Sequence, residues 1–387
     1  MTRVTNSCRW LTAAIVCAQF FFASVALAGN DTIPCAIRWD AFDTGLSNSI
    51  NKDVTRTLSP AIYWSRAPWY SVPNGANSMI IDGDIQAIMD QEIRYAHDAG
   101  LTCWVYLWYG VNHPMQNAWR LHQASSIKNE VNWAQMLPFG AIHGPGGFSQ
   151  LTPEIISYMR QQNYQRVVND RPLWFLFDDG GYKTELPGYW GNNPAEFATA
   201  LLRFRAAVQA AGLPNPYIVM LDGGADGNAA TAASLGADAV SNYIPDFGAE
   251  ARAKPWAKVA ASISSYWKRL GSSASAHGIK VVPIAATGWD TRPRKQNVVS
   301  WEVATRPPNE DLSVYDVLPT PRELTVELQS SVSYVTNNPK IADSKVVLIY
   351  AWDECDEGGN CLIPHYNPAA PGVPDTRILN AFRDVHW

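Results

Sequence analysis

The sequence lacks the features that mark several large classes of protein. It has no run of basic residues, and a formal net charge of -5 gives no reason to expect nucleic acid as a partner. The seven histidines are scattered, and no Cys or His cluster has the spacing of a zinc site. A Gly-x-Ser-x-Gly elbow and a Gly-rich phosphate fingerprint are also missing. These absences lead us to expect neither a metal nor a cofactor.

Long apolar runs are missing beyond the N-terminus. The chain opens with Arg3 and Arg9, continues with a mostly apolar stretch at 11–25, and reaches the small-residue site Ala26-Leu27-Ala28, which is the pattern of a cleavable export signal. That stretch is too short for a convincing membrane span, and no other stretch reaches about 18 apolar residues. We therefore expect a signal peptide at 1–28 and a secreted or periplasmic domain at 29–387, with no integral membrane segment.

Cysteine is scarce, with six residues in 387. Removal of the signal peptide leaves an even set of four, which favours pairing in an oxidising compartment. Cys355 and Cys361 are six residues apart around Gly-Gly-Asn, so we expect a small looped disulfide, with two free buried thiols as the alternative. The sequence leaves open whether Cys35 and Cys103 pair.

What is present is an alternation of apolar runs and segments with helical periodicity. The strand-like runs lie at 35–39, 103–108, 131–138, 173–177, 217–221, 239–244, 281–285 and 346–351. Helical periodicity covers 85–99, 154–164, 195–211, 256–274 and 321–336, whereas the Gly-Pro-Gly-Gly stretch at 144–147 opens no clear helix. Continuous apolar strands are typical of a parallel sheet buried on both faces. The pattern predicts an α/β fold, a single (β/α)8 TIM barrel with long strand-to-helix loops, and an open doubly wound sheet is the alternative.

Carboxylates and aromatic residues gather where these strands end, which is where the active site of a barrel lies. Carboxylates bind sugar hydroxyls, and Trp and Tyr cover the apolar faces of sugar rings, although core packing is the alternative use of the aromatics. We therefore expect a poly- or oligosaccharide as partner, bound by Asp40, Trp69, Trp108, Tyr109, Asp178, Asp179, Asp222, Tyr243, Trp289, Asp290 and Arg292. For Arg292, a structural ion pair with Asp290 is the alternative.

The last strand ends in four carboxylates within five residues, at positions 353–357. Crowded carboxylates drive their pKa values apart, which supplies one protonated and one ionised group at the same pH. Cleavage of a glycosidic bond needs such a pair. Glu354 and Glu357 are the best candidates, and a solvated acidic loop or an adventitious calcium site is the alternative.

The same segment carries a resemblance to a known family. It is similar to the strand-end motif Trp-Asn-Glu-Trp-x-Glu-Gly, with a following Pro, of family 99 glycoside hydrolases, which include endo-α-mannosidases and endomannanases and have relatives in family 71. Residues 163–175 resemble the junction before the fourth strand of that family, and residues 288–294 resemble its Trp-Asp-x-x-Pro-Arg loop after the seventh. In this chain the motif reads Trp352-Asp353-Glu354-Cys355-Asp356-Glu357-Gly358, with Pro364 following.

The resemblance implies that Glu354 and Glu357 are the catalytic pair of a glycosidase that cleaves an α-linked saccharide. It further implies a retaining route, in which the first Glu deprotonates the sugar 2-hydroxyl to form a 1,2-anhydro intermediate and the second protonates the leaving oxygen. Asp353 and Cys355 depart from the motif. Residues 29–80 match only loosely, so subsites built there do not transfer.

Two further functions stay open. One is a barrel glycosidase that uses Asp178 or Asp179 as nucleophile and Glu357 as acid. The other is a non-catalytic carbohydrate-binding barrel.

Overall fold

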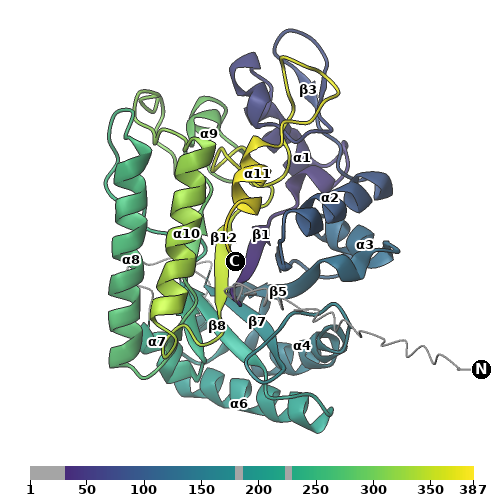
Figure 1. Cartoon of the computed structure of the whole chain (residues 1–387). Coiled ribbons are helices and arrows are strands. Elements are labelled where there is room, and N and C mark those ends of the chain that lie inside the picture. The colour runs from purple at the N-terminus through teal and green to yellow at the C-terminus, as the bar shows by residue number, and fades with distance from the viewer. Residues whose placement is uncertain (1–30, 179–185, 223–228) are drawn as a thin grey trace, which may run out of the picture.

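The computed structural model describes residues 31–178, 186–222 and 229–387 (Figure 1). The segment expected to be a signal peptide, 1–28, lies outside these residues, as does Asp179. Within the part of the chain that is described, no helix has the length and apolar character needed to cross a bilayer.

Nine parallel strands form one curled sheet, in the order β10-β9-β8-β7-β5-β4-β1-β12-β11. Most of these strands are apolar runs with buried side chains, as the continuous sequence pattern predicts. The strands are β1 (Ile33–Arg38), β4 (Cys103–Leu107), β5 (Asn132–Pro138), β7 (Arg171–Asp178), β8 (Tyr217–Asp222), β9 (Ala239–Ser241), β10 (Lys280–Val281), β11 (Ile284–Ala286) and β12 (Val346–Tyr350). Short antiparallel pairs are added by β6 (Arg166–Val167) on β7 and by β2 (Val72–Pro73) with β3 (Met79–Ile80).

The run expected to be one strand at 281–285 is split into β10 and β11, which lie at opposite ends of the strand order. Only Val282 and Pro283 separate them. The Val282 N–H still bonds to the Val240 carbonyl at 3.0 Å, and the Pro283 carbonyl accepts from the Leu348 N–H at 2.9 Å. Proline has no N–H to donate to a ladder, which accounts for the interruption.

Helices surround the sheet (Figure 1). They are α1 (Ser49–Leu58), α2 (Gln86–Asp98), α3 (Asn117–Ala124), α4 (Gly144–Met159), α6 (Pro194–Ala210), α7 (Ala229–Leu235), α8 (Trp256–Ala276), α9 (Arg292–Gln296), α10 (Pro321–Asn337) and α11 (Arg377–Arg383). The segments with helical periodicity in the sequence correspond to α2, α4, α6, α8 and α10. The shorter helices carry too few turns for a clear period.

The start of α4 corrects one expectation, because the helix begins at Gly144 within the Gly-Pro-Gly-Gly stretch. Gly144 has a φ of +71°, and a Cβ there would lie 2.8 Å from the Tyr189 carbonyl, so the glycine permits the close approach. Pro145 suits the first helical turn, where no N–H partner is needed. Phe148 then anchors the turn against Phe204, with the ring centroids 5.3 Å apart. Tertiary packing outweighs the low helix propensity of glycine.

Two disulfides cross-link the chain. Cys35 of β1 bonds Cys103 of β4, and these two residues are direct partners in the strand register. Cys355 bonds Cys361, as the spacing predicts, and closes a loop just after β12. Both bonds are buried, and both fit an oxidising compartment.

The two disulfides should differ in their effect on stability. Cross-linking residues 68 apart restricts the unfolded chain more than cross-linking residues six apart. The loop-entropy relation gives about 4 kcal/mol for the first and about 2 kcal/mol for the second. Denaturant unfolding of Cys35→Ala/Cys103→Ala and of Cys355→Ala/Cys361→Ala measures both. Equal losses of unfolding free energy would contradict the chain-entropy explanation.

Candidate active site

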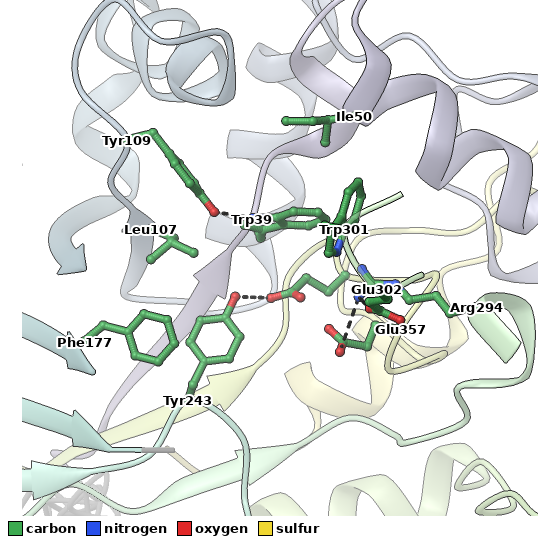
Figure 2. A pocket seen from close by; sticks show the side chains of 11 residues that line it. Trp39, Ile50, Leu107, Tyr109, Phe177, Tyr243, Arg294, Trp301, Glu302 and Glu357 are labelled. Carbon is green, nitrogen blue, oxygen red and sulfur yellow. Dashed lines mark hydrogen bonds and ion pairs between the residues drawn. The ribbon is translucent and has the colours of Figure 1, made fainter. Parts of the chain in front are cut away.

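A cavity of about 540 Å³ opens at the C-terminal ends of the strands. Aromatic and apolar side chains form most of its wall, and carboxylates with one guanidinium occupy one side (Figure 2). The lining residues are Trp39, Ile50, Leu107, Tyr109, Phe177, Tyr243, Arg294, Trp301, Glu302, Glu354 and Glu357. Both members of the expected carboxylate pair are therefore in one cavity with two of the expected aromatics, Tyr109 and Tyr243.

Glu354 and Glu357 share a hydrogen-bond partner, the hydroxyl of Tyr350 at the end of β12. That hydroxyl lies 3.2 Å from Glu354 Oε2 and 2.7 Å from Glu357 Oε2. Tyr243, which follows β9, donates its own hydroxyl proton to Glu354 Oε1. The two tyrosines thus hold the carboxyl pair from two different strands of the sheet.

Arg294 forms an ion pair with one member of the pair, Glu357, and its charge acts on Glu354 only from farther away. Its guanidinium lies 3.3 Å from Glu357 Oε1, 2.8 Å from Asp356 Oδ2 and 2.9 Å from Glu302 Oε1. The arginine belongs to α9, which follows β11, and its side chain is buried. It therefore links the loop after β11 to the acidic segment after β12. Glu354 makes no ion pair with any residue that the structure describes.

These contacts set the two carboxyl groups apart in protonation. Burial raises the pKa of Glu354 well above its ordinary value, and the neighbouring Glu357 charge raises it further. Burial also works to raise the pKa of Glu357. There the Arg294 charge, a hydrogen bond from Glu354 and a hydrogen bond from Tyr350 outweigh burial, so the pKa of Glu357 lies below its usual value. As pH rises, Glu357 therefore loses its proton first, and Glu354 is the member of the pair that keeps its proton longer.

An aromatic wall faces the carboxyl pair. Trp39, after β1, and Trp301, in the loop after α9, meet edge to face with centroids 5.5 Å apart. The Trp39 indole N–H donates to the Tyr109 hydroxyl at 2.7 Å. On the opposite side the Phe177 and Tyr243 rings stack at 4.8 Å. A cavity of this shape offers flat apolar faces beside a proton donor and a carboxylate.

Asp40 lies outside the cavity, although the sequence suggested a role in binding. It is buried, and Arg38 donates to it at 2.7 Å. The same guanidinium reaches Glu92 at 2.8 Å. The carboxylate at the end of β1 therefore satisfies a structural arginine and is not turned toward a ligand.

Trp108, Trp289 and Trp69 also lie away from the cavity. Trp108 is 3% exposed and packs in an aromatic cluster with Trp133 and Tyr158. Trp289 stacks on Phe247 with centroids 4.5 Å apart. Trp69 packs edge-on against neighbouring aromatics. These placements follow the packing alternative rather than contact with a ligand.

Asp290 and Arg292 form the structural ion pair that was the alternative to sugar binding. Their charged atoms are 2.6 Å apart, and Asp290, which is 1% exposed, is also 3.5 Å from Arg66. Asp178 is the last residue of β7, and the Asp178 side chain is buried. In the strand register its partner is Asp222 of β8. Neither Asp178 nor Asp290 lines the cavity.

Several lining residues were missed in the sequence. Arg294 lay inside the motif at 288–294 and Trp39 at a strand end, so both had a local signal. Trp301 and Glu302 come from the long loop at 288–320, which has no period to interpret. Phe177, Leu107 and Ile50 look like ordinary core residues in sequence.

Two groups of potential metal ligands occur among the described residues. In the first, Cys355 and Cys361 with His365, the thiols are consumed by their mutual disulfide. In the second, Asp40, Asp43 and Asp353, the guanidinium of Arg38 already supplies the positive charge. Neither group calls for a metal ion.

Comparison with known proteins gives a likeness of structure. No protein-family model matches the sequence, and no curated protein matches it. A solved structure of the family 99 endo-α-mannosidase from Bacteroides thetaiotaomicron is similar with a TM-score of 0.52 and 12% identity, over 91% of this chain and 95% of that chain. A second structure of this enzyme gives 0.49 and 13% over 90% and 95%, and a family 5 endoglucanase from Clostridium acetobutylicum gives 0.45 and 9% over 92% and 98%. The resemblance drawn from the motifs is therefore confirmed as a shared fold with the family 99 endo-α-mannosidase.

Proposed function

We propose that the protein is a glycosidase that cleaves an α-linked poly- or oligosaccharide with Glu354 and Glu357. The observation that carries this proposal is the carboxyl pair with opposite pKa shifts, held by Tyr350 beside an aromatic wall. Glycosidic cleavage requires one protonated and one ionised carboxyl on either side of the scissile bond. The fold shared with a family 99 endo-α-mannosidase supports the same function.

The resting protonation supports a particular division of roles. Glu354 holds the proton and would donate it to the departing oxygen, while Glu357, ionised beside Arg294, would act as base or nucleophile. The motif resemblance implies the reverse order, with the first Glu as base. The contact between Arg294 and Glu357 is the reason for our assignment, because a carboxylate paired with a guanidinium is a poor proton donor.

The spacing of the pair supports a retaining outcome. Inverting enzymes leave room for a water between carboxyls about 6.5–9.5 Å apart. Here both carboxyls contact the one Tyr350 hydroxyl, at 3.2 Å and 2.7 Å, so the two contacting oxygens lie closer together than that range. In the 1,2-anhydro route, Glu357 would take the proton of the sugar 2-hydroxyl. In the alternative route it would attack the sugar carbon directly.

The same proposal includes a closed barrel architecture and a secreted or periplasmic location. We take β10 and β11 to be one strand interrupted at Pro283, which closes the sheet as an eight-stranded barrel and brings every βα loop to the cavity. The two disulfides and the sequence at 1–28 support a secreted or periplasmic enzyme formed by a single domain at 29–387.

Substitution of the carboxyl pair tests the proposal. Glu354→Gln and Glu357→Gln should each lower kcat by at least about a hundredfold, because each removes a proton-transfer group and keeps its shape. The measurement is hydrolysis of a polysaccharide panel, with circular dichroism to verify the fold. If both variants stay active while Asp178→Asn is inactive, the nucleophile is the fourth-strand aspartate. If the native protein binds saccharides but cleaves none, it is a carbohydrate-binding barrel.

The two tyrosines should move opposite limbs of the pH profile. Activity needs Glu357 ionised and Glu354 protonated, so it rises as pH passes the lowered pKa and falls as pH passes the raised one. Tyr350→Phe removes the 2.7 Å hydrogen bond that lowers the pKa of Glu357, together with a longer 3.2 Å contact to Glu354, and should move mainly the acid limb, up by about 1 pH unit. Tyr243→Phe removes one that lowers the pKa of Glu354 and should move the alkaline limb up. Movement of the same limb by both variants would sink the assignment of roles.

Two tryptophans separate binding from packing. Trp301 is 41% exposed in the cavity, so Trp301→Ala should weaken substrate binding by about 1–2 kcal/mol with little change in melting temperature. Trp289→Ala should lower the unfolding free energy by about 3 kcal/mol because its ring packs on Phe247. Michaelis constants and thermal melts of both variants show which tryptophan contributes to substrate binding and which to stability. A Trp301→Ala enzyme with unchanged kinetics would exclude this aromatic wall as a substrate platform.

A further inference from the structure

A second hollow lies outside the sheet, between the N-terminal halves of α8 and α10, which run side by side (Figure 1). Its volume is about 320 Å³, and its lining shares no residue with the cavity described above. Ala260 and Ala261 of α8 and Val326 of α10 give it an apolar surface. Neither the motif resemblance nor the carboxyl pair assigns this groove a role.

Glu327 of α10 lines the groove and is the unusual feature of it. Its side chain is 2% exposed, and none of the described residues gives it a hydrogen bond or an ion pair. Burial raises the pKa of this carboxyl to about 8. A buried carboxyl without a partner costs stability, since it has lost water and gained nothing in return.

A second buried polar atom at the groove, the indole nitrogen of Trp256, also has no hydrogen-bond partner within the described part of the chain. Trp256, the first residue of α8, lines the groove, and its indole nitrogen has no acceptor among the described residues. The ring is 3% exposed, so it offers no open face on which a sugar could stack. The groove thus combines an apolar body, an unpaired acid and an unpaired N–H.

The other charged groups nearby do not compensate Glu327. Arg322 and Glu323 line the groove from α10, and Glu323 is engaged in the capping box with Thr320. The part of α8 that lines it carries no titratable group. On the α11 side of α10, Arg377 is bound to Asp375. Burial is the sole cause of the raised pKa, so none of these charges acts on the carboxyl.

We propose that this groove binds a small primary amine, whose ammonium group pairs with Glu327 and whose hydrocarbon part lies on Ala260, Ala261 and Val326. A cation is the partner that an unpaired buried carboxylate needs, and hydroxyl ligands leave its charge uncompensated. The carboxylic acid gives its proton to solvent as the ion pair forms, so binding at neutral pH releases one proton and leaves the ammonium intact. The site is independent of the proposed glycosidase activity.

Calorimetry on the full-length protein tests the proposal, with n-butylamine as probe and 1-butanol as its uncharged counterpart. Titrations in buffers of different ionisation heat should show release of about one proton at pH 6.5. As pH increases, the apparent affinity should rise about tenfold per pH unit until the pH reaches the pKa of about 8. Above that pH it should level off. Equal affinity for 1-butanol, or binding without proton release, would overturn the proposal.

Two variants and a matched control complete the test. Glu327→Gln should weaken butylamine binding at least tenfold, whereas Glu323→Gln, in the same groove, should bind as the native protein does. Glu327→Leu should also lose binding yet melt at a higher temperature, because an apolar side chain replaces an unpaired acid. This increase separates lost binding from lost folding. Native affinity in Glu327→Gln would refute the assignment, and hydrolase activity needs no measurement in any of these experiments.

Discussion

One buried arginine fixes the frame on which the cavity at the strand ends is built. Arg38, at the end of β1, lies 2.7 Å from Asp40, 2.8 Å from Glu92 of α2, and 3.7 Å from Asp353 after β12. Its guanidinium also stacks over the Trp104 ring of β4 at 4.6 Å. A single cation thus links three neighbouring strands, β1, β4 and β12, to a helix. Removal of one partner would leave an unpaired charge in the interior, which lowers the free energy of unfolding by about 3–5 kcal/mol.

The same cluster shows how the acidic segment after β12 is tolerated. Four carboxylates in five residues would repel one another if all were charged and close together. The fold separates them: Asp353 turns to Arg38, while Asp356 and Glu357 turn to Arg294. Glu354 is left between the two arginines without an ion pair among the described residues. Burial, reinforced by the neighbouring Glu357 charge, raises the pKa of Glu354, and the carboxyl with the raised pKa is the one that no arginine pairs with.

The sequence predicted the sheet better than it predicted the cavity, for a physical reason. A strand buried on both faces leaves a continuous apolar run, and all eight runs became strands, with the interruption at Pro283 as the one change. A cavity depends on which way a side chain turns at the strand end. Trp108 and Tyr109 are adjacent, yet Trp108 packs in the core and Tyr109 lines the cavity. Trp301 and Glu302 arrive from a loop whose path only tertiary contacts determine.

Glu354 and Glu327 make clear why a raised pKa does not by itself identify an active site. Burial is the main cause in both cases. Glu354 has a second carboxyl with the opposite shift, two tyrosine hydroxyls that fix its oxygens, and aromatic faces across the cavity. Glu327 has none of these and can only accept a charge that arrives from outside. The same shift therefore suits proton transfer in the first setting and cation binding in the second, and the surrounding residues decide between them.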